Sequence, residues 1–244
     1  MKLKKATLIF GYNEYVLEVA RSLQKSYEYI TIFRSEDEEE FTKEEINFRV
    51  QEYDLSDNWN ILEDEYDIEN SIVFCMIEDD AQNIFLTISL RSLFEDLTII
   101  ALSNSKESSN KLKMAGANKV IPVVETTANI MSDILKKPVA TQILHDILYS
   151  SSSLKIAQIR VEKEENFHGK YPSDIEWHKD YRVLVISIIY GKDMKGEFIY
   201  SSKAKHHQIT NGDIFVIVGY EKDIVAFESR VGSRCNVNWN RWSR

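Results

Sequence analysis

The sequence predicts an α/β fold, with a parallel sheet in the first half of the chain and a smaller α+β unit in the second. The stretch TLIFGYNEYVLEVA, residues 7–20, has the pattern of a buried strand, a turn at Gly11 and an amphipathic helix. Strand-like and helix-like segments then alternate to residue 124, as in repeated β-α-β units with right-handed crossovers. After Ser150 the pattern changes to strands punctuated by glycines. A strand, glycine turn and helix at the start are typical of a Rossmann-like domain.

Composition limits the class of protein. The chain has 244 residues, 43% hydrophobic and 28% charged, enough for one large or two modest globular domains. Its net charge of -9 argues against an extended nucleic-acid interface. Cys75 and Cys235 provide neither zinc-site spacing nor a disulfide framework, which fits a reducing cytosol. No apolar run approaches the roughly 20 residues of a membrane helix. We therefore expect no direct membrane insertion, and any membrane role only through a partner.

Six strands and the helices between them are expected in the first half. The near-continuous apolar run SIVFCMI at 71–77 predicts a strand covered on both faces. Gly116 is expected to end the helix before it. The acidic run at 35–40 is interpreted as a solvated surface. The expected strands are 7–10, 29–33, 48–53, 71–77, 97–102 and 119–124, and the expected helices are 14–25, 57–65, 79–94 and 105–114.

Residues 125–149 have a helical pattern that Pro138 divides into two helices. Their apolar faces are supplied by Ile130, Ile134, Ile143, Leu144, Ile147 and Leu148. Such faces need a cover, and either a second subunit or packing within one chain could provide it. The pattern alone leaves both open.

The second half is expected to be a small α+β domain after a linker at 150–153. The strands are expected at 155–161, 181–190, 196–200 and 213–220, followed by a helix at 221–229. The tail contains Trp239 and Trp242 and is either a loose end or a docking peptide. The predicted organisation is a Rossmann-like lobe at 1–124, connecting helices at 125–150, the α+β domain at 151–229 and a tail at 230–244.

Two long stretches carry a family resemblance: IVFCMIEDDAQNIFLTISLRSL at 72–93 and TIIALSNSKESSNKLKMAGANKVIPVVETTANIMSDILKKP at 98–138. They resemble the RCK family of regulators of potassium conductance, also called KTN or TrkA-N. The matching residues are Asp79, Asp80, Asn83, Arg91, Leu112, Ala115, Gly116, Ala117, Val120 and Ile121. KIAQIRVEKEENFHGK and NGDIFVIVGYEKDIVAFE, at 155–170 and 211–228, are similar to the companion TrkA-C domain.

This resemblance implies a cytoplasmic, non-enzymatic regulatory domain of a potassium channel or potassium uptake system, held at the inner face of the membrane by a partner subunit. It implies homodimers formed through helices 125–149, which assemble further into a ring such as an octamer. A ligand would act by favouring one shape of the dimer or ring. The alternatives are a ligand-free scaffold in the same ring and, less favoured, an NAD(P)-dependent oxidoreductase.

The resemblance also implies a nucleotide, ADP, ATP or NAD(H), over the ends of the strands. The residues it assigns are the phosphate turn Gly11, Tyr12, Asn13, Glu14 and Tyr15, then Arg34 at the ribose, Asp54 and Ser56 beside the base, and Glu78 and Asp79 in the middle of the cleft.

The sequence departs from the family pattern at this site. Of the three glycine positions in G-x-G-x-x-G only Gly11 is glycine, and Asn13 and Val16 occupy the others. Arg34 cannot accept hydrogen bonds from ribose hydroxyls as a carboxylate does, although it could pair with a phosphate. No metal site is expected, because the positions matching the family's calcium ligands are Met76, Leu102 and Asn104. His145, His168, His178, His206 and His207 all follow the first 144 residues and are interpreted as surface residues.

Overall fold

The computed structural model describes residues 5–24, 27–36, 48–149, 153–190, 196–199, 201 and 206–235. The chain divides into two compact units, the first ending at Ser132 and the second beginning at Asp133. Residues 37–40 of the predicted acidic run, residues 150–152 of the predicted linker, and the tail beyond residue 235 lie outside the described residues.

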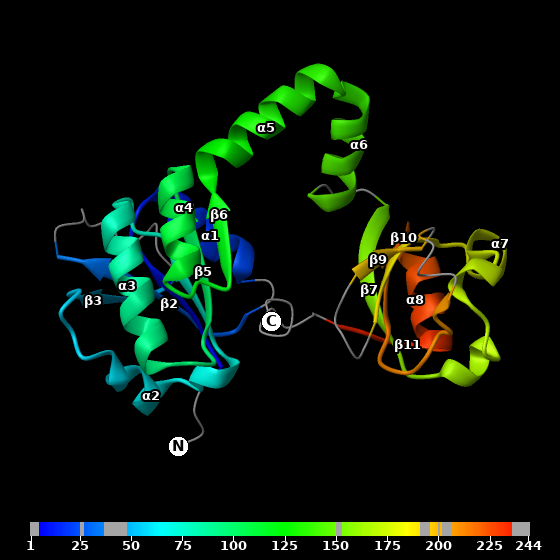
Figure 1. Cartoon of the computed structure of the whole chain (residues 1–244), viewed down its shortest axis with the longest axis horizontal. Helices are drawn as coiled ribbons and strands as arrows, with labels where there is room; N and C mark the ends of the chain where they lie inside the picture. Colours follow the sequence, from blue (N-terminus) through cyan, green and yellow to red (C-terminus); the bar gives the residue numbers. More distant parts are fainter. Residues whose placement is uncertain are drawn as a thin grey trace. The chain divides into compact units, whose positions relative to one another are not determined.

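The first unit is built on a parallel sheet with strand order β3-β2-β1-β4-β5-β6 (Figure 1). Every strand pairing in this sheet is parallel, as in Thr7 opposite both Ile30 and Ile72. The order and direction confirm the predicted Rossmann-like sheet. The strands are β1 (Thr7–Phe10), β2 (Ile30–Ser35), β3 (Arg49–Tyr53), β4 (Ile72–Cys75), β5 (Thr98–Ser103) and β6 (Lys119–Pro122).

Helices cover both faces of this sheet because successive strand residues point in opposite directions. Leu8 and Phe10 of β1 join a core that includes Leu86 of α3 (Asp80–Leu93) and Leu112 of α4 (Lys106–Met114). Ile9, between them, packs on the opposite face, where α1 (Glu14–Leu23) lies. The near-continuous apolar sequence of the central strands follows from this double cover.

Two predicted elements differ from the structure. The expected helix at 57–65 is a 3₁₀ turn, η1 (Trp59–Ile61), continued by a single helical turn, α2 (Leu62–Glu65), with a further 3₁₀ turn η2 (Ile68–Asn70). The last expected strand is too long, because β6 ends at Pro122 and the following helix begins at Val123. β6 is an edge strand that hydrogen-bonds only with β5 among the described strands, so its pairing ends where β5 ends.

Arg91 on α3 joins three segments of this half of the sheet. Its guanidinium donates to the Leu97 carbonyl at 2.7 Å, the Gly116 carbonyl at 3.0 Å and Asn118 Oδ1 at 2.7 Å. It also donates to the Phe94 carbonyl at 3.0 Å and to the carbonyl of Glu95. The end of α3, the start of β5 and the α4–β6 turn are thus held by one side chain.

Arg91→Lys is expected to lower the free energy of unfolding by about 2 kcal/mol, because an ammonium cannot reach these acceptors together and leaves part-buried carbonyls unsatisfied. Arg21→Lys is the matched control, since Arg21 contacts only the exposed Glu18 and should shift stability by less than about 0.5 kcal/mol. Urea unfolding of both variants gives the comparison. Equal effects of the two changes would contradict the role assigned to Arg91.

The second unit contains an antiparallel sheet with order β11-β7-β10-β8-β9, which confirms a small α+β domain after the parallel sheet. Its core packs Phe167, Trp177, Phe215 and Phe227 together. The elements are β7 (Leu154–Val161), η3 (Glu164–Phe167), η4 (Pro172–Asp174), α7 (Trp177–Tyr181), β8 (Leu184–Ile189), β9 (Gly196–Phe198), β10 (Ile214–Tyr220), α8 (Glu221–Val231) and β11 (Gly232–Arg234).

Two features of this unit were not predicted. The expected strand at 181–190 begins only at Leu184, because helix α7 runs to Tyr181 and Arg182 takes a left-handed conformation with φ of 57°. The start of the expected tail is structured, since β11 pairs with β7 and places Gly232 opposite Val161. At Gly232 an added Cβ would lie 1.9 Å from the Arg160 carbonyl oxygen, so only glycine fits this approach.

Helices α5 (Val123–Lys136) and α6 (Pro138–Leu148) are separated at Pro138 as predicted. Neither helix has a buried residue. Within the described range 123–149 the apolar faces of the two helices therefore carry no fully buried side chain. The exposed large apolar residues are Val124, Ile130, Met131, Ile134, Leu135, Val139, Ile143, Leu144 and Leu148. Within the described part of the chain, no helix combines the length and apolarity needed to cross a bilayer.

Candidate functional site

The candidate site lies at the carboxyl ends of β1 and β4, where the strand order reverses direction. β1 pairs with β2 on one side and with β4 on the other. In open parallel sheets the crevice outside such a switch point is the usual ligand position. The segments that follow β1, β2, β3, β4 and β5 bring most of the predicted site residues to this edge.

The turn after β1 requires glycine for a steric reason. Gly11 has φ of +120°, and a Cβ there would lie 2.6 Å from the Met76 carbonyl oxygen. Tyr12 is 5% exposed and packs in the core beneath α1 with Val16 and Met76. Its side chain is therefore turned away from the crevice surface, whereas Glu14 and Tyr15 are exposed in the first turn of α1.

Asn13 has two hydrogen-bonding roles at the crevice. Its Oδ1 accepts from the Val16 backbone N–H at 2.9 Å and caps α1. Its Nδ2 donates to Glu78 Oε1 at 3.1 Å. The side chain that replaces the second glycine thus bridges from the end of β1 to the end of β4.

Asn104, just beyond β5, continues this bridge. Its Nδ2 donates to the Glu78 carbonyl at 3.1 Å, and its backbone N–H donates to Asp80 Oδ1 at 3.1 Å. Asn13, Glu78, Asn104 and Asp80 therefore form a continuous polar chain across the ends of β1, β4 and β5. We call this set the crevice bridge.

Arg34 is engaged by a neighbouring carboxylate. Its Nη2 lies 2.5 Å from Glu52 Oε1, with the Arg34 side chain 13% exposed. The guanidinium carbon also lies 5.7 Å from the centre of the Tyr12 ring, within the range of a cation–π contact. A ligand phosphate would compete with Glu52 for this arginine.

Asp54, Ser56 and Asp79 make local contacts at this edge. Asp54 Oδ1 accepts from the backbone N–H of Ser56 at 2.7 Å and from its hydroxyl at 2.5 Å. These bonds from Ser56 hold the pKa of Asp54 below its ordinary value. Asp79 Oδ1 accepts from the Gln82 N–H at 2.9 Å and caps α3. Both carboxylates thus have a structural role in a turn or a helix cap.

Three residues of this edge were not among the predicted site residues. Asn104 bonds Glu78, and Glu52 pairs with Arg34. The second pair depends on the register of β2 and β3, in which Arg34 lies opposite Glu52. Asn83 is buried. Its Oδ1 accepts a hydrogen bond from the Ile77 backbone N–H at 2.9 Å, and its Nδ2 donates to the Ile77 carbonyl at 2.8 Å. It also donates to the Leu102 carbonyl at 3.3 Å. Asn83 was one of the family-matching residues, and the structure gives it the role of fixing the ends of β4 and β5.

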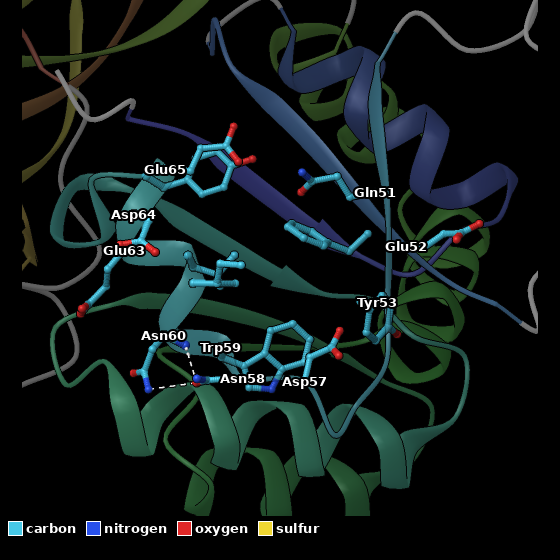
Figure 2. A pocket seen from close by; sticks show the side chains of 14 residues that line it. Gln51, Glu52, Tyr53, Asp57, Asn58, Trp59, Asn60, Glu63, Asp64 and Glu65 are labelled. Atoms are coloured by element: carbon cyan, nitrogen blue, oxygen red, sulfur yellow. Dashed lines mark hydrogen bonds between the residues drawn. The ribbon is translucent and has the colours of Figure 1, made fainter. Parts of the chain in front are cut away.

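A separate hollow of about 850 Å³ lies between β3 and the 57–66 segment (Figure 2). Figure 2 shows Glu65 facing Gln51 of β3 across it, and Glu63 and Asp64 also line the hollow. It exists because the short turns η1 and α2 cover less of the sheet than a full helix. Its lining is Phe33, Gln51, Glu52, Tyr53, Asp57, Asn58, Trp59, Asn60, Ile61, Leu62, Glu63, Asp64, Glu65 and Tyr66. None of the predicted site residues is among them, and the carboxylates disfavour a phosphate. Among the described residues, no three His, Cys, Asp or Glu side chains are grouped to hold a metal ion.

Comparison with known proteins identifies the first unit. Residues 7–123 match the family described as the TrkA-N domain. This half of the chain is a TrkA-N domain. A curated relative, the probable potassium channel protein 2 of Methanocaldococcus jannaschii, is 31% identical over 103 residues, which are 42% of this chain and 25% of that protein. The aligned part thus spans about a quarter of the relative's length.

The likeness to one solved structure covers more of this chain than the TrkA-N domain. The human SLO3 gating ring superposes with a TM-score of 0.63 at 13% identity, covering 91% of this chain and 46% of that one. At this identity the likeness concerns the fold, a TrkA-N domain followed by a small antiparallel domain. The GsuK RCK domain is also similar, with a TM-score of 0.45 at 17% identity over 93% of this chain and 46% of the other.

Proposed function

We propose that this chain is a regulatory domain of a potassium channel or potassium uptake system and that it works as an oligomer at the inner face of the membrane, held there by a partner subunit. One observation carries the proposal: a TrkA-N domain is followed directly by two helices whose apolar side chains are uncovered. The relative named as a potassium channel shares sequence with 42% of this chain. On this proposal the chain is not an enzyme.

Helices α5 and α6 form the homodimer interface in this proposal. Ile130, Ile134 and Leu135 of α5 and Ile143 and Leu144 of α6 are each about half exposed or more. Exposed apolar side chains in this number are costly in water and indicate an interaction site. A second copy presents the same surface, so a two-fold axis can pair like with like.

A ring requires a second, different interface on each chain, since one isologous contact closes a dimer. The neighbouring helices α3 and α4 supply it: Phe85, Ile88 and Met114 are 52%, 51% and 88% exposed. Dimers joined through this face would form the ring, such as an octamer, that the sequence resemblance implies.

Two states of the crevice are consistent with this role. In the first, an adenine nucleotide or NAD(H) binds at Gly11 to Tyr15, Arg34, Asp54, Ser56, Glu78 and Asp79, and shifts the oligomer between two shapes through its different affinity for them. In the second, the crevice is empty and the domain is a scaffold. The hydrogen bond from Asn13 to Glu78 and the ion pair of Arg34 with Glu52 favour the second. An oxidoreductase is the weakest candidate, because no histidine occurs in the first 144 residues.

Native mass spectrometry of the wild-type protein tests the proposal, alone and with ADP, ATP, NADH or calcium. We expect a dimer or a larger even-numbered assembly at micromolar concentration. Cells that lack the chain are expected to differ from wild-type cells in their uptake of radioactive rubidium. Restoring the wild-type chain is expected to return the uptake to the wild-type level. A monomer under every condition, with unchanged rubidium uptake, would contradict the proposed function.

A further inference from the structure

Glu78 occupies an unusual place for a carboxylate in this fold. The N-terminus of the first helix in such a sheet carries partial positive charge and free N–H groups, which suit the phosphates of a nucleotide. Here the Glu78 carboxylate lies 3.1 Å from Nδ2 of Asn13, the residue that caps this helix. The chain therefore brings its own anion beside the capping residue of the helix end that suits a ligand phosphate.

Glu78 is held in this position from the opposite side. Asn104 donates to the Glu78 carbonyl, and the same asparagine is fixed by Asp80 at the start of α3. These anchors, from the end of β5 and the start of α3, fix the Glu78 backbone, and the hydrogen bond from Asn13 holds its carboxylate. Glu14, Asp79 and Asp80 add negative charge at the same edge.

We propose that Glu78 is a built-in competitor for the phosphate of a nucleotide, and that such a ligand enters the crevice only when the Asn13–Glu78 hydrogen bond breaks. This inference rests on the nucleotide-sensing form of the proposed function. Glu78 is exposed and makes a single side-chain bond to Asn13, so the closed arrangement can be opened by a ligand of sufficient affinity. A crevice that is open only part of the time lowers apparent affinity by the open fraction.

Opening also affects other parts of the domain. Because Asn104 joins the Glu78 backbone to Asp80, movement of Glu78 away from α1 displaces the links to β5 and to the first turn of α3. Glu78 would therefore connect occupancy of the crevice with the helix whose exposed Phe85 and Ile88 form the second proposed interface. The ligand class is a phosphate-bearing nucleotide, and the regulation is displacement of an internal carboxylate.

The test is isothermal titration of ADP into the purified wild-type protein and into the Glu78→Gln, Glu78→Ala and Glu69→Gln variants. Glu69→Gln is the matched control, because it removes the same charge from an exposed glutamate of η2, before β4, that belongs neither to the crevice bridge nor to the proposed nucleotide site. Removing Glu78 is expected to tighten ADP binding by about tenfold, the effect of losing one charged hydrogen bond. The control is expected to change binding by less than about threefold, as for an exposed charge.

Three results would overturn the inference: Glu78 variants that bind ADP no better than Glu69→Gln, wild type that binds as tightly as Glu78→Ala, or no ADP binding by any variant. Native mass spectra of the same samples separate this outcome from failure of the proposed function. If the assembly persists while ADP never binds, the competitor role of Glu78 fails and the oligomeric regulatory domain stands. Loss of the assembly in the wild type would instead count against the function itself.

Discussion

Replacing Ile134 and Ile143 together by Asp is expected to abolish the homodimer interface formed by α5 and α6. If the native protein is a dimer, the variant becomes a monomer; if it is a larger assembly, the variant becomes a smaller one. Both side chains are about half exposed in the single chain, at 49% and 53%, so the substitutions leave each fold intact. In a two-fold interface each change occurs twice, and each buries an unpaired carboxylate. We expect the dissociation constant to rise by about a hundredfold or more.

Sedimentation velocity at several micromolar concentrations measures this effect, and circular dichroism checks the fold. Asn129→Asp on α5 is the control, because it adds a carboxylate at an exposed polar position of that helix. If the double variant sediments like the wild type, α5 and α6 do not form the interface. If Asn129→Asp dissociates the assembly equally, added charge alone explains the effect.

Gly11→Ala is expected to destabilise the first unit by about 3 kcal/mol, from a disfavoured backbone conformation combined with overpacking. The added Cβ would lie 2.6 Å from the Met76 carbonyl oxygen, and that carbonyl belongs to the backbone just after β4, which cannot rotate aside as a side chain would. Relief of the contact must separate β1 from β4 at the crevice.

Gly212→Ala provides the comparison for this prediction. Gly212 also has a positive φ, +94°, but an added Cβ there meets no atom within 4 Å. Only the conformational cost of about 1 kcal/mol remains. Amide hydrogen exchange measures the stability of the first unit in the Gly11→Ala variant and that of the second unit in the Gly212→Ala variant. Similar losses at the two glycines would show that the Met76 contact contributes nothing.

The parallel sheet was predictable from sequence because its signal is local. The TLIF strand, Gly11 and the helix after it follow period and turn rules that need no knowledge of distant residues. The N-terminal helix caps were not among our predictions, although their signal is equally local: Asn13, Asp79 and Ser105 are good N-cap residues, and each caps its helix. The break at Pro138 is likewise a property of proline itself.

The pairings at the crevice were not predictable in this way. Arg34 was assigned to a ribose or a phosphate, and its contact with Glu52 depends on the register of β2 against β3. Asn104 and Glu78 are 26 residues apart and meet only because β4 and β5 are neighbours. Tyr12 lies next to the turn in sequence, but core packing under α1 decides the direction of its ring. The assignment of these residues to a nucleotide stays a prediction.

The contacts of Arg91 have a consequence for how the domain opens. One guanidinium joins the end of α3, the first residues leading into β5 and the turn between α4 and β6. These segments cannot separate one at a time without stranding several carbonyl acceptors at once. We expect this side of the sheet to fluctuate as one cooperative block. Asn104 and Asp80 lie on the α3 and β5 side of it, whereas Asn13 caps α1 beyond β1. The hydrogen bond between Asn13 and Glu78 is thus a side-chain link from this block to α1, added to the backbone pairing of β4 with β1.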